Sequence, residues 1–243
     1  MIYVYDDNTH DTSVLFSQLR KDFRRAGVSR CNADDVFSGG LNPASDVLIV
    51  PGGKDLNYCK DLNGKGTKII REFVHKGGGY LGLCAGAYFG SREISWAEGT
   101  EQAASGPREL ALVDCRAIGP VENFIESLEG CWFNAVTVSF NEAVFSALYT
   151  GGPVFEVSGN CDVLARYTDL PGSPPSVVGN RFGRGYAILC SPHLEAAVEE
   201  FESRIYHTNP YFEKLLFTAR KMRNTEEKQK AAWIEMIGRL IPA

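Results

Sequence analysis

The sequence predicts an α/β fold whose centre is a doubly wound, mostly parallel β-sheet. Three short segments, at 2–5, 45–50 and 80–83, are dominated by apolar residues, as expected for strands that are covered on both faces. Between them, apolar residues recur at the period of an α-helix. Strand, helix and strand in this rhythm are typical of βαβ units with right-handed crossovers.

The first part of the chain supplies most elements of that sheet. We expect a helix from about residue 12 to 26, a strand at 28–31 and a second helix from 67 to 76. Glycines 77–79 end the second helix, because glycine readily adopts the left-handed conformation at a helix terminus. Later in the chain, the apolar segment 185–190 predicts a further buried strand of the same sheet.

The middle of the chain, from 91 to 182, changes to short β-rich pieces. Segments 136–140, 153–158 and 163–167 predict strands, and a run of proline, glycine and serine at 171–175 predicts a turn. We expect antiparallel strands or hairpins in this region, placed at the edge of the parallel sheet.

Two helices are expected in the tail of the chain. We assign residues 1–200 to the α/β domain and residues 201–243 to a helical extension packed on it. The first helix begins at 209–210, an Asn-Pro pair, and the second begins at Asn224, with Glu227 completing the pattern of a capping box. The tail residues predicted to face the core are Phe212, Leu215, Leu216, Ala219, Trp233, Ile237 and Leu240.

Composition excludes several functional classes. A net charge of −5 argues against nucleic acid as a partner, because phosphate binding needs clustered basic residues. No run approaches the ~20 apolar residues of a membrane span, so we expect a soluble protein. The seven scattered cysteines form no CxxC pair, which disfavours both a disulfide framework and a zinc ribbon. We therefore expect a cytoplasmic protein without a metal ion or another cofactor.

The strongest local signal is the segment 82–86, Gly-Leu-Cys-Ala-Gly, between a predicted strand and a predicted helix. It has the pattern of a nucleophile elbow with cysteine in place of serine. The two glycines allow a sharp turn that lifts the thiol of Cys84 above the sheet. A helix N-terminus there favours the thiolate, because its free N–H groups and dipole stabilise negative charge.

His193 and Glu195 are the predicted partners of Cys84. They follow directly after the strand at 185–190, at the edge of the sheet where ligands bind. A histidine there can act as the base for the thiol. A carboxylate two residues later can hold the second ring nitrogen and fix the tautomer.

A third element is the Pro51-Gly52-Gly53 turn, which ends the strand at 45–50. Its backbone N–H groups can face a developing oxyanion. Together with the amide of Ala85, the residue after the predicted nucleophile, the turn forms the oxyanion hole expected for acyl transfer.

The order of PGG at 51–53, GLCAG at 82–86 and PHLE at 192–195 resembles the class I glutamine amidotransferase superfamily. More narrowly, VPGGKDLNY at 50–58 and GGGYLGLCAGAYFGS at 77–91 are similar to the amidotransferase-like N-terminal domain of eukaryotic-type biotin-protein ligases. The match to the amidotransferase superfamily spans residues 1 to about 200. It implies a flavodoxin-like fold and a catalytic site of Cys84, His193 and Glu195, with Gly53 and Ala85 at the oxyanion hole.

The chain departs from this resemblance in two respects. Members that use glutamine usually carry Gln four residues after the nucleophile, where this chain has Tyr88. No ligase catalytic pattern follows residue 200, so we expect no biotin transfer by this chain alone. From their place at the carboxyl edge of the sheet, the residues predicted to contact substrate are Gly52, Asp55, Asn57, Tyr58 and Tyr88.

Three functions fit these residues. The first is an amide or acyl hydrolase or transferase that forms a thioester at Cys84 and acts on a small-molecule or peptide acyl substrate. The second is a non-catalytic module that uses the same pocket to bind a small molecule or a partner protein. The third is a peptidase of the same superfamily. The complete Cys-His-Glu pattern favours retained chemistry.

Overall fold

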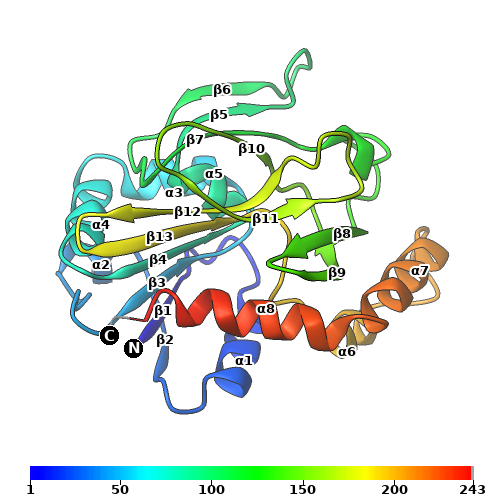
Figure 1. Ribbon diagram of the computed structural model, residues 1–243, viewed down its shortest axis with the longest axis horizontal. Coiled ribbons are helices and arrows are strands. Elements are labelled where there is room, and N and C mark those ends of the chain that lie inside the picture. The colour runs from blue at the N-terminus through cyan, green and yellow to red at the C-terminus, as the bar shows by residue number, and fades with distance from the viewer. Residues whose placement is uncertain (242–243) are drawn as a thin grey trace.

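The computed structural model describes residues 1–241 and confirms the α/β architecture (Figure 1). Its largest feature is a nine-stranded sheet of order β2-β1-β3-β4-β13-β12-β11-β8-β9. The first five strands in this order are parallel. They are β2 (Val28–Cys31), β1 (Ile2–Tyr5), β3 (Val47–Val50), β4 (Gly79–Leu83) and β13 (Gly185–Cys190).

The other four strands continue the same sheet in antiparallel pairing. They are β12 (Pro175–Phe182), β11 (Asp162–Tyr167), β8 (Asn134–Phe140) and β9 (Ala143–Tyr149). The predicted β-rich middle of the chain is therefore confirmed. These strands extend the parallel sheet beyond β13, because β12 and β13 form a hairpin whose outer strand offers a free edge to β11.

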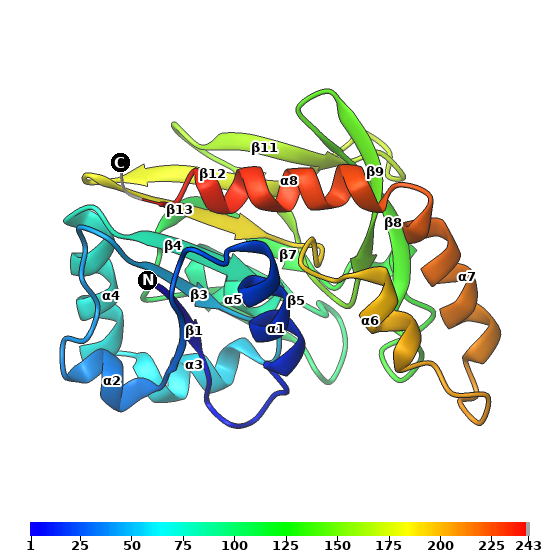
Figure 2. The ribbon, with the colours of Figure 1, turned by 90° about the horizontal axis from the view of Figure 1, so that it is seen from below.

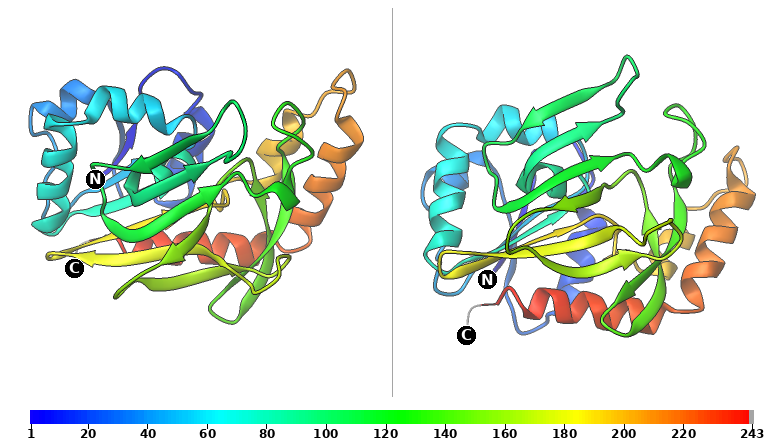
Figure 3. Two further views of the ribbon diagram at one scale, coloured as in Figure 1. Left: turned by 90° about the horizontal axis from the view of Figure 1, so that it is seen from above. Right: turned by 45° about the horizontal axis from the view of Figure 1, so that its top comes forward.

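A second, four-stranded sheet was not predicted as a separate unit. It has the order β10-β7-β5-β6 and lies on the opposite face of the main sheet from the long C-terminal helix (Figure 3). Sequence periodicity indicates that a strand forms but not which strand it pairs with. Its strands are β10 (Val154–Val157), β7 (Val113–Gly119), β5 (Ser91–Trp96) and β6 (Ala104–Pro107), and a 3₁₀ turn follows at Glu122–Phe124.

Helices cover both faces of the parallel half of the sheet (Figure 2). Leu15 and Leu19 of α1 share one apolar core with the C-terminal helix, whereas helices α2 to α5 share a second core with the small sheet. The helices of the first half are α1 (Ser13–Asp22), α2 (Ala33–Phe37), α3 (Asp55–Leu62), α4 (Lys65–His75) and α5 (Ala85–Gly90).

Several predicted boundaries were wrong. Helix α1 ends at Asp22, four residues before the predicted end, and Phe23 then leaves the helical conformation. Helix α2 was missed, although Asn32 and Asp35 form a capping box at its start. No capping box forms at Asn224, since the N-cap of α8 is Thr225, one residue later, and its side chain makes no capping hydrogen bond to the helix.

The tail packs on the α/β domain through three helices, α6 (Val198–Ser203), α7 (Phe212–Arg223) and α8 (Glu226–Gly238). Helix α8 runs beneath the sheet (Figure 1), and Trp233 is only 1% exposed, with its ring edge-on to Phe23. Leu240 lies against Gly79 so closely that a Cβ atom there would be 2.4 Å from the Leu240 carbonyl oxygen. Among residues 1–241, no helix combines the length and apolar character needed to cross a bilayer.

We expect the Trp233→Ala substitution to lower the free energy of unfolding by about 3–5 kcal/mol, because a fully buried indole leaves a cavity. The matched control is Ile234→Ala, since Ile234 is 41% exposed and its loss should cost about 0.5 kcal/mol or less. Urea unfolding of both variants measures the difference. Equal losses would show that α8 does not dock on the sheet through its Trp233 face.

Candidate active site

Cys84 lies at a sharp turn between the carboxyl end of β4 and the first residue of α5, with φ of 48°. The flanking glycines are required by close backbone packing. A Cβ atom at Gly82 would lie 2.2 Å from the Gly86 carbonyl oxygen, and one at Gly86 would lie 2.0 Å from the Val50 carbonyl oxygen. The local geometry is therefore that of a nucleophile elbow, and the side chain of Cys84 lies at the floor of a cavity.

His193 and Glu195 form a close ion pair after β13. Nδ1 of His193 lies 2.6 Å from Oε1 of Glu195, and their side chains are 15% and 9% exposed. The backbone of His193 is fixed by a bridge to β9, in which its N–H donates to the Leu148 carbonyl at 2.8 Å. Burial alone lowers the pKa of His193, but the Glu195 carboxylate and the neighbouring Cys84 raise it by more, so this pKa lies well above its usual range.

The second ring nitrogen of His193 contacts a residue that the sequence did not indicate. Nε2 lies 2.7 Å from Oγ1 of Thr150, one residue beyond the end of β9. Thr150 comes from the β-rich middle of the chain, where no motif marks it, and only the pairing of β8 and β9 with the main sheet places it beside His193. The histidine therefore has a partner at each ring nitrogen.

The turn at 51–53 joins the same site. A Cβ atom at Gly52 would lie 3.0 Å from Cε1 of His193 and 3.6 Å from Cβ of Cys84. The Tyr58 hydroxyl holds this turn by donating to the carbonyls of Pro51 (3.2 Å) and Gly52 (2.9 Å). Within residues 1–241, no hydrogen-bond acceptor is assigned to the amide of Gly53 or to that of Ala85, so both remain available as donors.

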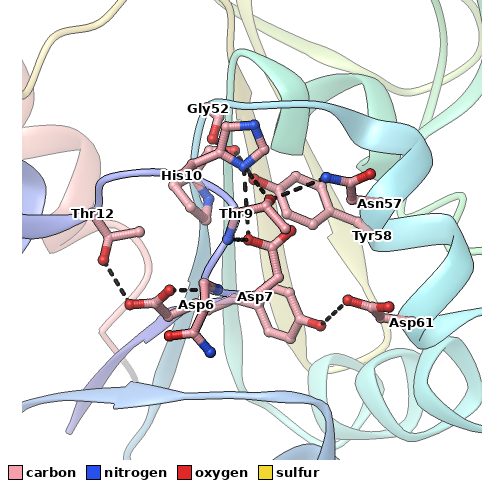
Figure 4. Close-up of polar contacts among 12 residues, drawn as sticks. Asp6, Asp7, Thr9, His10, Thr12, Gly52, Asn57, Tyr58 and Asp61 are labelled. Carbon is pink, nitrogen blue, oxygen red and sulfur yellow. Dashed lines mark hydrogen bonds and ion pairs between the residues drawn. The ribbon is translucent and has the colours of Figure 1, made fainter.

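His10, which follows β1, also reaches this site (Figure 4). Its ring lies against Gly53, where a Cβ atom would be 2.6 Å from the ring. Nδ1 of His10 lies 2.7 Å from Oγ1 of Thr9 and 3.7 Å from Oδ1 of Asp7. His10 was not among the predicted site residues, because only the fold brings the loop after β1 next to the glycine turn.

These residues surround a cavity of about 630 Å³. Of the five residues predicted to contact substrate, Gly52 lines this cavity. The structure places three others elsewhere: Asp55 pairs with Arg108 at 2.7 Å, Asn57 donates to Oγ1 of Thr9, and Tyr58 is buried beneath the turn. The polar lining includes Cys84, Gly52, Gly53, His10, Thr12, Thr150, His193, Glu195 and Asn209, together with the charged residues Asp11, Glu200 and Arg204.

Tyr88, the fifth residue, points into the protein interior and is 3% exposed. Its hydroxyl donates to the Gly151 carbonyl at 3.1 Å, and its ring packs edge-on against Trp96. Burial raises the pKa of Tyr88 well above its usual value, so the hydroxyl stays protonated as a donor. Tyr88 thus joins the elbow helix to the loop that carries Thr150.

Comparison with known proteins places the chain in a family. The family model described as "Biotin-protein ligase, N terminal" matches residues 6–240. The chain belongs to this family. The matched range extends through α6, α7 and α8, beyond residues 1 to about 200, over which the sequence resembles the wider amidotransferase superfamily.

Two related sequences are similar to this chain over about two thirds of its length. An uncharacterized protein of Chlamydia muridarum is 36% identical over 175 residues, which cover 69% of this chain and 68% of the relative. The biotin–protein ligase of Schizosaccharomyces pombe is 34% identical over 169 residues, or 65% of this chain and 27% of the ligase. The chain thus spans about a quarter of the ligase's length.

Solved structures confirm the class I glutamine amidotransferase-like fold. A glutamine amidotransferase from Thermotoga maritima superimposes with a TM-score of 0.58 at 12% identity, covering 100% of this chain and 98% of the other. A second structure, also described as a glutamine amidotransferase, gives a TM-score of 0.54 at 23% identity and covers 80% of this chain and 90% of that one. At these identities the likeness shows the fold alone.

The C-terminal helix of this family member reaches the histidine pair through Gln229, which is 2% exposed. The side-chain amide nitrogen of Gln229 donates to the carbonyls of Leu194 (3.1 Å) and Ala196 (2.9 Å), on either side of Glu195. The two bonds restrain the backbone that carries the carboxylate. No sequence motif indicates this role, because it depends on how α8 docks.

We expect Glu195→Gln to lower the pKa of His193 by about one unit or more, since the neutral amide no longer favours the imidazolium. The folded-state pKa of His193 lies above its unfolded value, so protonation stabilises the wild type fully below about pH 6.5. That contribution is lost as pH rises through the folded-state pKa. The stability difference between wild type and variant should therefore narrow over this window. NMR titration measures the His193 pKa in each protein, and urea unfolding measures the stability difference as a function of pH. A stability difference that widens as pH rises would contradict the prediction.

We also expect Gln229→Leu to shift the His193 titration toward its usual range, because Glu195 loses the two bonds that hold its backbone. The control is Thr225→Val, which removes a different contact of the tail, the 2.8 Å bond from the Ser146 N–H to Oγ1 of Thr225. Both variants should lose about 1–2 kcal/mol of stability. NMR should show a shifted His193 titration in Gln229→Leu and an unchanged one in Thr225→Val. Equal titrations in the two variants would show that Gln229 does not affect the histidine pair.

Proposed function

We propose that this protein is a cysteine-dependent acyl-transfer enzyme that hydrolyses an amide, or transfers its acyl group, through a thioester at Cys84. One observation carries the proposal. The elbow cysteine, the His193–Glu195 pair and Gly53 line one cavity, and the unpaired amide of Ala85 directly follows the cysteine. These are the nucleophile, the base with its orienting carboxylate, and the oxyanion donors of acyl transfer.

The reaction follows from these positions. His193 takes the thiol proton, and the Cys84 sulfur attacks the carbonyl carbon to form a C–S bond. The amides of Gly53 and Ala85 bind the resulting oxyanion. When the C–N bond breaks, the amine leaves with the proton from His193, and a thioester remains. Water then loses a proton to His193 and adds to the thioester, the C–S bond breaks, and the acid is released with the thiol restored.

Glutamine is not the amide that this site favours. The position that carries Gln in glutamine-using proteins is Tyr88 here, and its side chain is buried with its hydroxyl on the Gly151 carbonyl. It cannot contact a substrate without leaving the core. The proposed substrate is therefore another small-molecule or peptide acyl compound.

A second candidate is a binding module without turnover, and the contact between Thr150 and Nε2 of His193 supports it. Nε2 is the nitrogen that must exchange a proton with the thiol and the leaving group. If the Thr150 hydroxyl remained hydrogen-bonded to Nε2, proton transfer would be blocked and the cavity would serve only to bind a ligand. Catalysis requires that the Thr150 hydroxyl release Nε2 when the substrate binds, so that His193 can exchange protons with the thiol and the leaving group.

Alkylation by iodoacetamide separates the two candidates. For the acyl-transfer enzyme, Cys84 should react at pH 6 to 7 faster than the other cysteines, and His193→Ala should slow it about tenfold or more, because the imidazolium no longer stabilises the thiolate. Peptide mapping by mass spectrometry gives the rate at each cysteine.

His75→Ala is the control, since His75 is exposed at the end of α4 and its loss should leave the Cys84 rate unchanged. The proposal fails if Cys84 reacts like an ordinary thiol in the wild type and His193→Ala makes no difference. That result would favour the binding module, whose ligand should still bind to Cys84→Ala.

A further inference from the structure

The cavity above Cys84 has one strongly apolar wall. Beyond Thr150 and His193 it is lined by Leu148, Trp132, Phe133, Phe201 and Leu215. Phe133 stacks on Phe201 of α6 with ring centroids 5.9 Å apart, yet it is 42% exposed. A large apolar side chain held at the surface beside a reactive cavity is suited to contact an apolar ligand.

The wall is preformed by contacts that fix Trp132. The indole N–H donates to the carbonyls of Ser127 and Leu128, both at 3.1 Å. The ring lies against Gly151, where a Cβ atom would be 2.7 Å from it, and packs on Trp96 at 5.6 Å. A ligand therefore meets a surface that needs no ordering, which favours affinity.

The apolar surface continues past the active-site cavity. An adjoining hollow of about 480 Å³ shares Trp132, Phe133 and Leu215 with it and adds Leu128 and Tyr211. A group that enters beside His193 can thus extend along the tail helices. The shape fits an elongated apolar group better than a compact one.

The charges around the cavity disfavour a carboxylate. Arg204 is the only lysine or arginine among the described residues that line it. Its guanidinium is already engaged, at 3.1 Å from Asp11 and 3.2 Å from Glu200. A ligand carboxylate at this end of the cavity would lie near two protein carboxylates, and since the side chains of this cluster are 44–59% exposed, solvent screens the repulsion and it disfavours an anion only modestly.

We propose, building on the acyl-transfer function above, that the substrate carries an elongated apolar group next to its scissile carbonyl and bears no carboxylate. Free amino acids such as glutamine are disfavoured, because they carry a carboxylate and lack an elongated apolar group. The residues that select the apolar group are Trp132 and Phe133. The net negative charge of the Asp11–Arg204–Glu200 cluster disfavours anions.

Chloroacetamides with different N-substituents test this selection. In each probe the Cys84 sulfur displaces chloride and forms a C–S bond, so only the substituent differs. The N-(2-phenylethyl) probe should alkylate Cys84 about tenfold or more faster than unsubstituted chloroacetamide, after division by the rates with glutathione. The N-(2-carboxyethyl) probe should be no faster than the unsubstituted one. Equal corrected rates for all three would overturn the inference.

Three variants show which residues cause the difference between probe rates. Phe133→Ser should remove most of the preference for the phenylethyl probe, whereas Phe217→Ser should preserve it, since Phe217 is 59% exposed on α7 and does not line the cavity. The double variant Asp11→Asn, Glu200→Gln frees Arg204 and should accelerate the carboxyethyl probe several-fold. An unchanged carboxyethyl rate would show that this cluster does not reject anions.

The outcome can be separated from the fate of the acyl-transfer proposal. At pH 9 an ordinary thiol is largely ionised, so the probe ratios are measurable even if His193 does not activate Cys84. Slow alkylation of Cys84 at pH 6 with a strong preference for the phenylethyl probe at pH 9 would contradict the catalytic proposal and support the proposed ligand class. Fast alkylation at pH 6 without that preference would support the catalytic proposal and contradict the ligand class.

Discussion

The backbone of Cys84 has a conformation that only the surrounding packing can hold. A residue with a side chain and φ of 48° is strained, and here it lies where β4, β3 and α5 approach to van der Waals contact. Gly82 and Gly86 permit that approach, since a Cβ atom on either would overlap a backbone carbonyl. The thiol projects above the carboxyl edge of the sheet for this reason, and every other feature of the site is arranged around it.

Three separate parts of the chain complete the site. The parallel core supplies Cys84, the glycine turn and the His193–Glu195 pair. The β-rich middle supplies Thr150 and most of the apolar wall, because β9 pairs by a bridge with the backbone of His193. The tail supplies Gln229 behind Glu195 and Arg204 at the mouth of the cavity. The family match to residue 240 agrees with this physical dependence of the site on the tail.

The fold could be predicted for those elements whose bounds follow from the local sequence alone. The strands β1, β2 and β13 begin and end at the predicted residues. In β1 and β13 an apolar run leaves little choice of register, whereas β2, which is half polar, is delimited by Gly27 before it and Asn32 after it. Helix α3 was missed because its first residues follow a glycine turn and read as a loop. The small sheet was missed as a separate unit because strand partners are chosen by contacts between residues far apart in sequence.

The sequence by itself determined which residues form the elbow and that a histidine and a carboxylate follow a strand of the same sheet. Glycine spacing and strand ends are local properties, and parallel strands bring their carboxyl ends to a common edge. Only the tertiary structure decided what surrounds them: Thr150 on the second histidine nitrogen, His10 against Gly53, Gln229 behind Glu195, and Tyr88 turned inward. Each of these depends on the docking of a distant segment, which no local pattern encodes.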